Sequence, residues 1–299
     1  MTLYYADTFV LPLPPGHRFP MAKYARLRGR LAASGAFRED DFRVPAAASE
    51  GEILRAHDAG YLDRVVRGTL SPGEIRAIGF PWSEAMVERS RRSAGATVAA
   101  ARDALAQGWS ANLAGGTHHA FRDRGEGFCV FNDAAIAARA MVAEAGLARV
   151  AIVDCDVHQG NGTASILRGD PRAFTFSIHG ARNFPFEKEA GDLDIELADG
   201  TGDDDYLRAL ERGLDETFER AKPQLAIYLA GADPHEDDRL GRLALTARGL
   251  ERRDELVFSR LRSAGVPVAI AMAGGYGRDL EVTVGLHAAT ILAARRILG

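Results

Sequence analysis

The stretch VAIVDCDVHQGNG, residues 150–162, joins a buried strand to a group of polar side chains. Its first half is an apolar, β-branched run, which is typical of a strand covered on both faces. The run ends abruptly in Asp154, Asp156 and His158, which are spaced by two. Side chains two residues apart on an extended backbone point to the same side. The stretch therefore predicts a parallel strand that presents two carboxylates and an imidazole at its carboxyl end.

Other segments of the chain repeat this pattern of short apolar runs separated by helical periodicity. Strands that alternate with helices predict right-handed βαβ units and a mostly parallel sheet covered on both faces. The expected fold class is α/β, with residues 1–299 forming a single three-layer α/β/α domain. The predicted strands are 150–154, 173–178, 225–230 and 266–274, and the predicted helices are 83–108, 132–146, 203–221, 246–265 and 283–298.

Composition limits the class of protein. Hydrophobic residues make up 46% of the 299 residues, which is enough for a sizeable core, and the net charge of −4 argues against a broad nucleic-acid-binding face. Two cysteines, Cys129 and Cys155, predict no disulfide framework and hence a reducing, cytoplasmic location. We expect no membrane partner, because no apolar segment approaches the roughly 20 residues of a span. The sequence leaves the oligomeric state open.

Each predicted strand is followed by polar residues or glycines. His179 and Gly180 follow the second strand, Asp233 the third, and the GGYG segment 274–277 the fourth. In open α/β sheets the ligand site lies at the carboxyl ends of the strands, so these groups are expected to converge on one crevice. Long irregular stretches in a compact domain are often functional. Those predicted here are 7–20, 68–82, 113–131, 180–204 and 231–243.

Asp156, His158 and Asp233 fit a three-ligand metal site. Two carboxylates and one imidazole are ligands that zinc accepts, with positions left open for water and substrate, and iron(II) accepts them as well. A second interpretation is equally consistent with an isolated D-x-D-x-H pattern. In it, the aspartates cap turns and the histidine is a structural loop residue.

The segment GGTHHAFRDRGEGFCVFND, residues 115–133, contains adjacent histidines, His118 and His119. Adjacent histidines are rarely both buried, since each then needs hydrogen-bond partners. A general acid and a general base beside a metal-activated water would account for both, whereas a pair on the surface would need no role. Tyr276 lies on a glycine-flanked turn and has the hydroxyl to donate to a developing oxyanion, although a packing tyrosine fits the same motif.

Taken together, these motifs resemble the zinc-dependent histone deacetylase family, which has the arginase/deacetylase fold. The resemblance runs from about residue 16 to about residue 290, and its elements follow the family's order. The HQGNG segment is most similar to the class IV-like branch and its bacterial relatives. The matching segments are GHRFP, AHDAGYL, GGTHHAFRDRGEGFCVFND, VDCDVHQGNGT, GADPHEDDRLG and AGGYG.

The resemblance implies a role for each catalytic position. Asp156, His158 and Asp233 match the ligands of one catalytic Zn²⁺. His118 and His119 match the tandem histidines, and we expect His119 to act as the base. The remaining matches are Tyr276, which polarises the acyl carbonyl, Asp154 behind the first histidine, and Asn161 behind the second.

The resemblance also implies substrate and cation contacts. Phe128 and Phe184 match the aromatic walls of an acyl-lysine channel, and the Gly127 carbonyl matches the acceptor of the substrate amide. Leu240 stands at a rim position where polyamine-selective relatives carry an acid. A structural K⁺ site is implied at Asp154, the backbone carbonyls of Asp156 and His158, Ser177 and Ile178.

The function implied is metal-dependent hydrolysis of acetyl or other acyl groups from lysine side chains of a protein or peptide. The alternative is deacetylation of acetylpolyamines or other small acylated amines at the same site. Leu240 argues against a polyamine substrate. The acidic run 236–238, in contrast, predicts an acidic rim that favours cationic substrates. A catalytically inactive protein that only binds acyl-lysine is disfavoured, because no metal ligand, tandem histidine or tyrosine is missing. A binuclear site of the arginase type would need further aspartates.

Overall fold

The computed structural model describes residues 1–299 and contains one sheet of eight strands in the order β2-β1-β3-β8-β7-β4-β5-β6. Every neighbouring pair is parallel. The sheet is therefore parallel throughout, and the α/β class is confirmed. The strands are β1 Leu3–Tyr4, β2 Phe42–Arg43, β3 Trp109–Asn112, β4 Val150–Asp154, β5 Ala173–Gly180, β6 Leu193–Leu197, β7 Leu225–Leu229 and β8 Val268–Ala271.

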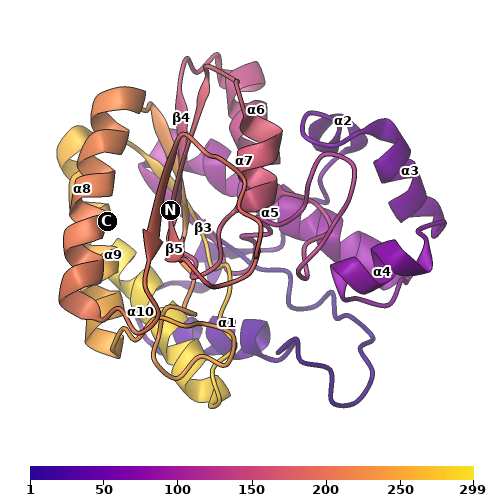
Figure 1. Ribbon diagram of the computed structural model, residues 1–299, viewed down its shortest axis with the longest axis horizontal. Coiled ribbons are helices and arrows are strands. Elements are labelled where there is room, and N and C mark those ends of the chain that lie inside the picture. The colour runs from indigo at the N-terminus through magenta and orange to yellow at the C-terminus, as the bar shows by residue number, and fades with distance from the viewer.

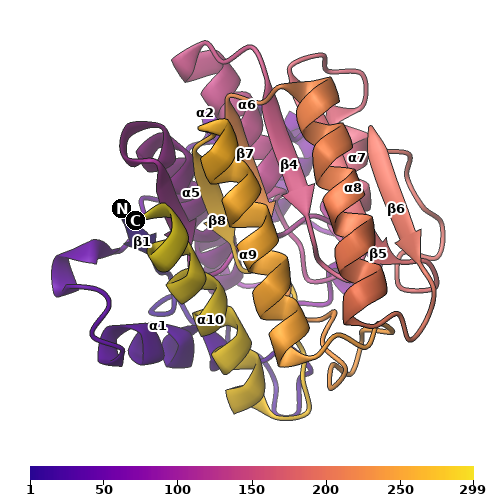
Figure 2. The ribbon, with the colours of Figure 1, turned by 90° about the vertical axis from the view of Figure 1, so that its left-hand side faces the viewer.

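Helices cover both faces of the sheet, as Figure 1 shows with the sheet seen nearly edge-on. α5 and α6 cover one face, and α1, α8, α9 and α10 cover the other (Figure 2). None of the helices is both long and apolar enough to cross a membrane. Their bounds are α1 Lys23–Ala33, α2 Glu50–Ile53, α3 Ala59–Arg67, α4 Pro72–Ile78, α5 Glu84–Gln107, α6 Asp133–Ala145, α7 Asn161–Leu167, α8 Asp203–Ala221, α9 Ala247–Ala264 and α10 Leu280–Leu298.

The core consists of two apolar layers, one on each face of the sheet. In β4, Val150 and Ile152 face the layer under α5 and α6, whereas Val153 faces the layer under α8 to α10. Cys155 continues this alternation into the second layer. Asp154 and Asp156 therefore point away from Cys155, as the spacing by two predicted.

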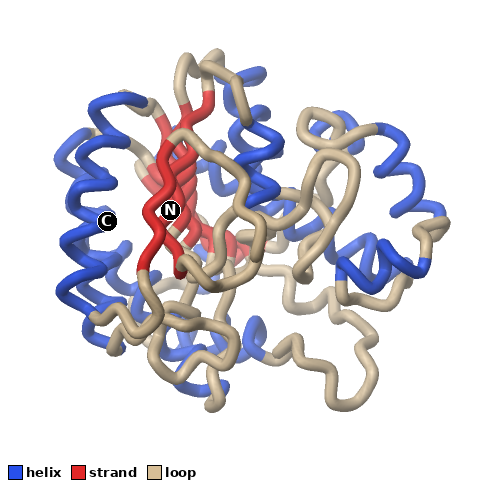
Figure 3. The backbone as a smooth tube through the Cα atoms, in the orientation of Figure 1, coloured by secondary structure: helices blue, strands red, loops and turns tan.

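The long predicted elements are confirmed. β4 has the predicted bounds, β5 extends two residues further to Gly180, and all five predicted helices are present. Ser83 caps α5 by accepting a hydrogen bond from the Met86 amide. The loops at the carboxyl ends of the strands gather at one edge of the sheet (Figure 3), which is where the ligand site was expected.

Two stretches predicted to be irregular contain regular structure. α4 lies within 68–82, where Ser71 and Glu74 form a capping box and Pro72 occupies the first turn. β6 lies within 180–204 at the edge of the sheet, where its LDIEL sequence is only partly buried. Short elements of this kind bury too few side chains to show a clear hydrophobic period. The short strands β1, β2 and β3 and the helices α1, α2, α3 and α7 were likewise not predicted.

Gly95 lets α5 pack directly against the chain at residues 46–48. A Cβ atom at Gly95 would lie 2.1 Å from the Ala46 carbonyl oxygen. We expect Gly95→Ala to lower the free energy of unfolding by about 1–3 kcal/mol through overpacking. Gly29→Ala in α1 is the matched control, since nothing lies within 4 Å of its Cβ position and a helical alanine is favoured. Urea denaturation measures both, and equal effects at the two positions would contradict the packing argument.

Candidate active site

The functional side chains meet at the carboxyl edge of the four central strands. Asp156 and His158 follow β4, Asp233 follows β7, and Tyr276 follows β8. The loop after β3 brings His118 to the same place. All of these residues line one cavity of about 740 Å³. The predicted site residues therefore lie together, because parallel strands bring their carboxyl ends to one edge of the sheet.

Asp156, His158 and Asp233 form a compact cluster whose ligand atoms all lie within 4.8 Å of one another. His158 Nδ1 lies 2.9 Å from Asp156 Oδ1 and 3.3 Å from Asp233 Oδ2. Asp233 Oδ2 is buried and makes no hydrogen bond. Burial and the neighbouring Asp156 carboxylate raise the pKa of Asp233 to about 7. Two buried carboxylates with an unpartnered oxygen fit a bound divalent cation, which would compensate their charge.

The backbone holds this cluster in place. The Val157 amide donates to Asp233 Oδ1 at 2.9 Å, and the Gly274 amide donates to Asp156 Oδ2 at 2.7 Å. Gly274 itself approaches so closely that a Cβ atom there would lie 1.9 Å from Asp233 Oδ2. The glycine of the GGYG segment is thus required by the space that the carboxylates occupy.

The two adjacent histidines differ in their partners and therefore in their charge. His118 Nδ1 lies 2.6 Å from Asp154 Oδ2. Burial alone would lower the pKa of His118, but Asp154 and Asp156 outweigh burial and raise it to about 9. The pKa of His119 is held well below its usual value by burial and by the neighbouring His118 and His158. His118 is thus suited to remain a cation and His119 to start as a neutral base.

A hydrogen-bonded chain fixes the tautomer of His119. Asn161 Nδ2 donates to Glu126 Oε1 at 2.7 Å, and a carboxylate only accepts hydrogen bonds. The amide oxygen of Asn161 therefore faces His119 Nδ1, at 2.7 Å. His119 carries its proton on Nδ1 and keeps a free lone pair on Nε2. The sequence did not indicate a role for Glu126, because nothing in the segment around this residue, which lies between two glycines, shows that it contacts Asn161.

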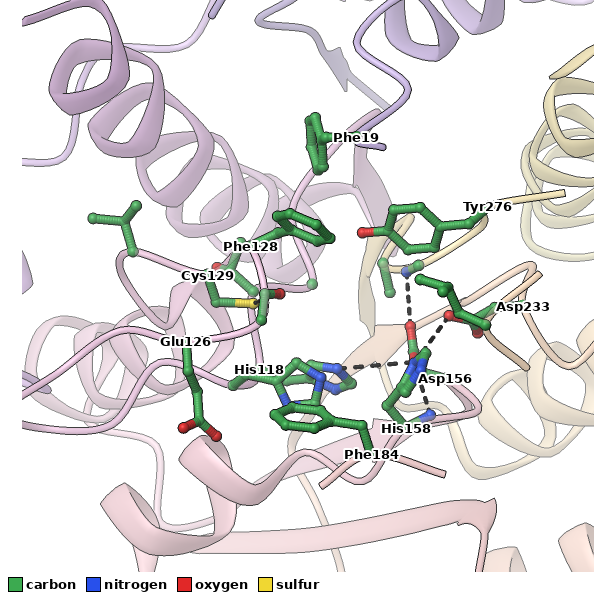
Figure 4. A pocket seen from close by; sticks show the side chains of 18 of the residues that line it. Phe19, His118, Glu126, Phe128, Cys129, Asp156, His158, Phe184, Asp233 and Tyr276 are labelled. Carbon is green, nitrogen blue, oxygen red and sulfur yellow. Dashed lines mark hydrogen bonds and ion pairs between the residues drawn. The ribbon is translucent and has the colours of Figure 1, made fainter. Parts of the chain in front are cut away.

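Aromatic rings form opposite walls of the cavity, as Figure 4 shows for Phe128 and Phe184. The Phe184 ring meets the His119 ring edge to face with centroids 4.9 Å apart. Phe128 packs against Phe19 and Phe80, at 5.5 Å and 5.3 Å between centroids. The predicted wall residues thus both line the cavity, and Phe19 and Phe80 are additional wall residues that the sequence did not indicate.

Helix α4 supports the wall that carries Phe128. The amides of Gly127 and Phe128 donate to the carbonyls of Ala77 and Ile78 at the end of α4. Phe128 adopts a left-handed backbone with φ of 66°, which costs about 1–2 kcal/mol for a residue other than glycine. The unpredicted α4 therefore has a direct part in shaping the cavity.

Tyr276 is positioned through its backbone. Its amide donates to the buried Asp238 Oδ2 at 2.6 Å, and Arg239 Nε donates to its carbonyl at 2.9 Å. Lys23 Nζ donates to the carbonyls of Ala273 and Gly275 in the preceding turn. Burial raises the pKa of Tyr276 well above its usual value, so that the hydroxyl keeps its proton and remains a donor.

The acidic rim expected from residues 236–238 is not found along the cavity lining, although Glu236 is exposed. Asp238 is buried and accepts from the backbone amides of Leu240, Gly241 and Tyr276. Asp237 forms an ion pair with Arg278. None of the residues 236–238 lines the cavity, although Leu240 does, as the resemblance implied.

The residues of the implied K⁺ site lie on neighbouring strands. Asp154 at the end of β4 pairs in register with Ser177 of β5, and Ile178 follows it. Asp154 Oδ1 accepts from the Asp156 amide at 3.1 Å, while Ser177 Oγ lies 2.9 Å from His179 Nδ1. These positions are compatible with the implied site, whose occupation by an ion stays a prediction.

One family model and several known proteins are similar to this chain. The family described as Histone deacetylase domain matches residues 17–291. An uncharacterised protein of Picosynechococcus sp. is 43% identical over 98% of each chain. The histone deacetylase-like amidohydrolase of Pseudomonas aeruginosa is 31% identical, covering 92% of this chain and 76% of its own. The crystal structure of an HDAC homolog from Aquifex aeolicus superposes with a TM-score of 0.84 at 24% identity, covering 98% of this chain and 82% of that one.

Proposed function

Since this chain belongs to the histone deacetylase family, we propose that it hydrolyses the amide bond of acylated lysine side chains, with residues 1–299 acting as one catalytic domain. The observation that carries the proposal is the metal-ligand cluster beside the tandem histidines and Tyr276 in one aromatic-walled cavity. These groups supply the base, the oxyanion donor and the metal ligands that amide hydrolysis needs.

Asp156, His158 and Asp233 would hold one divalent ion, which we propose to be Zn²⁺ because carboxylate and imidazole ligands suit it. When bound, such an ion supplies Lewis acidity, which acidifies a water molecule and polarises the amide carbonyl. Asp154, Ser177 and Ile178, with the carbonyls of residues 156 and 158, would hold a structural K⁺.

The chain's own residues move the protons. His119 Nε2 takes a proton from the attacking water, since Asn161 keeps the other ring nitrogen protonated. The Tyr276 hydroxyl donates a hydrogen bond to the oxygen that gains negative charge. His119 then returns its proton to the leaving amine, because an unprotonated amine is a poor leaving group. His118, whose Nδ1 lies 2.6 Å from Asp154 Oδ2, mainly orients its neighbours and tunes the electrostatics of the site.

The channel would bind the substrate's methylene stem between Phe128 and Phe184, where an apolar chain is removed from water. The Gly127 carbonyl would accept the substrate amide N–H. Acetylpolyamines are the weaker candidates, because the exposed charged residues that line the cavity are arginines rather than acids.

Metal removal tests this proposal. We expect a chelator to abolish turnover of an acetyl-lysine peptide and Zn²⁺ to restore it, because a bound ion would supply the Lewis acidity that activates the water and the amide carbonyl. Elemental analysis should find one metal ion per wild-type chain. Asp233→Asn should lower that ratio, because it removes the negative charge of one ligand. The Val157 amide can still donate to the Oδ1 atom at this position, so the side chain stays in place.

An acetylpolyamine assayed alongside the peptide distinguishes the two substrate classes. Turnover of the polyamine alone would move the function to small amines. Full metal content with no turnover of either substrate would contradict the hydrolase proposal.

A further inference from the structure

The mouth of the cavity carries positive charge. Arg18, Arg182 and Arg242 are the exposed charged residues among those that line the cavity. The acidic residues that line it are Glu126, which is half-buried, and Asp156 and Asp233 of the metal cluster, which are buried. A substrate that approaches from solvent therefore meets guanidinium groups first.

The three arginines come from three separate loops. Arg18 lies in the loop that precedes α1, Arg182 follows β5, and Arg242 lies in the loop between β7 and α9. Three independent segments thus contribute the same sign of charge to one opening. A single solvated arginine would be unremarkable on any surface, but charge gathered at the entrance of a low-dielectric cavity acts on an incoming substrate.

Neighbouring carboxylates compensate only part of this charge. Asp199 lies 3.1 Å from Arg242 and 3.7 Å from Arg182, whereas Arg18 has no ion-pair partner. Of the acids nearest in sequence to Leu240, Asp238 holds backbone amides, Asp237 pairs with Arg278, and Glu236 is exposed but does not line the cavity. One carboxylate is therefore shared by two of the three guanidinium groups at the mouth, and the third has none.

We propose that the substrate carries negative charge close to its acylated amine, as an acyl-lysine flanked by aspartate or glutamate in a peptide segment. This inference rests on the proposed lysine-deacylase function. Guanidinium groups bind carboxylates with paired hydrogen bonds, and complementary charge at an entrance raises the association rate. A lysine-rich flank or a polyamine would meet like charge instead, which opposes the preference that the acidic run 236–238 had indicated.

Three fluorescent peptides that share one acetyl-lysine test the proposal. Their flanking residues are acidic, neutral or basic, and both kcat/KM and the dissociation constant by fluorescence polarisation are measured at low and high salt. We expect the acidic peptide to have a kcat/KM about tenfold higher and a dissociation constant about tenfold lower than the basic one, the order that two screened surface ion pairs supply. The ratio should shrink at high salt.

Arg18→Glu is the decisive variant, because Arg18 lines the cavity without an ion pair and its loss breaks no contact with Asp199. It should lower the acidic-to-basic ratio in both readouts. Arg212→Glu is the matched control: it makes the same charge change at an exposed position in the middle of α8 and does not line the cavity. It should leave the ratio unchanged.

The two readouts separate this inference from the function on which it rests. An acidic preference in binding without turnover of any peptide would overturn the deacylase proposal and keep the charge preference of the mouth. Turnover of all three peptides at equal kcat/KM and equal affinity would overturn the charge preference and keep the deacylase. A ratio that Arg18→Glu and Arg212→Glu alter equally would assign the effect to net charge and overturn the role of the mouth.

Discussion

Replacing His119 with alanine is expected to lower kcat by a factor of about 10²–10⁴, the range that a positioned general base contributes. The loss falls on kcat because, in the proposed mechanism, the base acts on the attacking water and on the leaving amine, whereas Phe128 and Phe184 would hold the peptide stem. Metal content should stay at one ion per chain, since His119 is not part of the ligand cluster. Steady-state kinetics and elemental analysis on the same preparation measure both quantities.

Glu126→Gln tests the orientation of the His119 ring while the histidine itself is kept. A glutamine side chain both donates and accepts, so it no longer dictates which way the Asn161 amide faces. We expect about a tenfold loss in kcat, which corresponds to 1.4 kcal/mol. Asn161→Asp alone would place a second carboxylate against Glu126, and adding Glu126→Gln should recover activity. Wild-type kcat in Glu126→Gln would show that the chain of hydrogen bonds has no part in holding the base.

Removing the hydroxyl of Tyr276 is the second large change. Tyr276→Phe keeps the ring and the backbone contacts with Asp238 and Arg239, and removes the donor to the oxyanion. We expect kcat to fall by about 10²–10³ with KM nearly unchanged, as for loss of one oxyanion-hole donor. Single-turnover kinetics with the acetyl-lysine peptide measure the chemical step directly.

Tyr61→Phe is the matched control for the loss of a hydroxyl. The Tyr61 hydroxyl donates to the Val130 carbonyl at 2.8 Å, and Tyr61 does not line the cavity. This variant should lose about 1 kcal/mol of stability and keep kcat. If Tyr276→Phe retained kcat within a factor of three while Tyr61→Phe behaved as described, Tyr276 would be a wall residue rather than an oxyanion donor.

The parts of the site that were predictable are those that a local pattern encodes. The buried run before Asp154 and the spacing of Asp156 and His158 are visible in one stretch of sequence, and parallel sheets place such strand ends together. The metal cluster, the tandem histidines and Tyr276 were therefore brought together as expected.

The parts that were missed depend on partners far apart in the sequence. Glu126 has its role through Asn161, which is 35 residues away. Asp238 appeared to be a solvent-facing acid, but the Tyr276 amide, 38 residues away, makes it a buried acceptor. A sequence motif shows which donors and acceptors a side chain has. It does not show which distant residue forms a hydrogen bond with it.

The left-handed backbone of Phe128 affects which residues position 128 can accept during evolution. Glycine at this position would relieve a backbone cost of about 1–2 kcal/mol, but it would also remove a ring that packs against Phe19 and Phe80 and lines the cavity. Such a conformation persists where the surrounding packing over-determines it, and residues of this kind cluster at active sites and ligand clamps. Because loss of a packed aromatic ring costs more than the backbone strain, stability alone already favours a large apolar residue at position 128. The same ring thus stabilises the fold and walls the cavity, so the two demands on position 128 select one residue type.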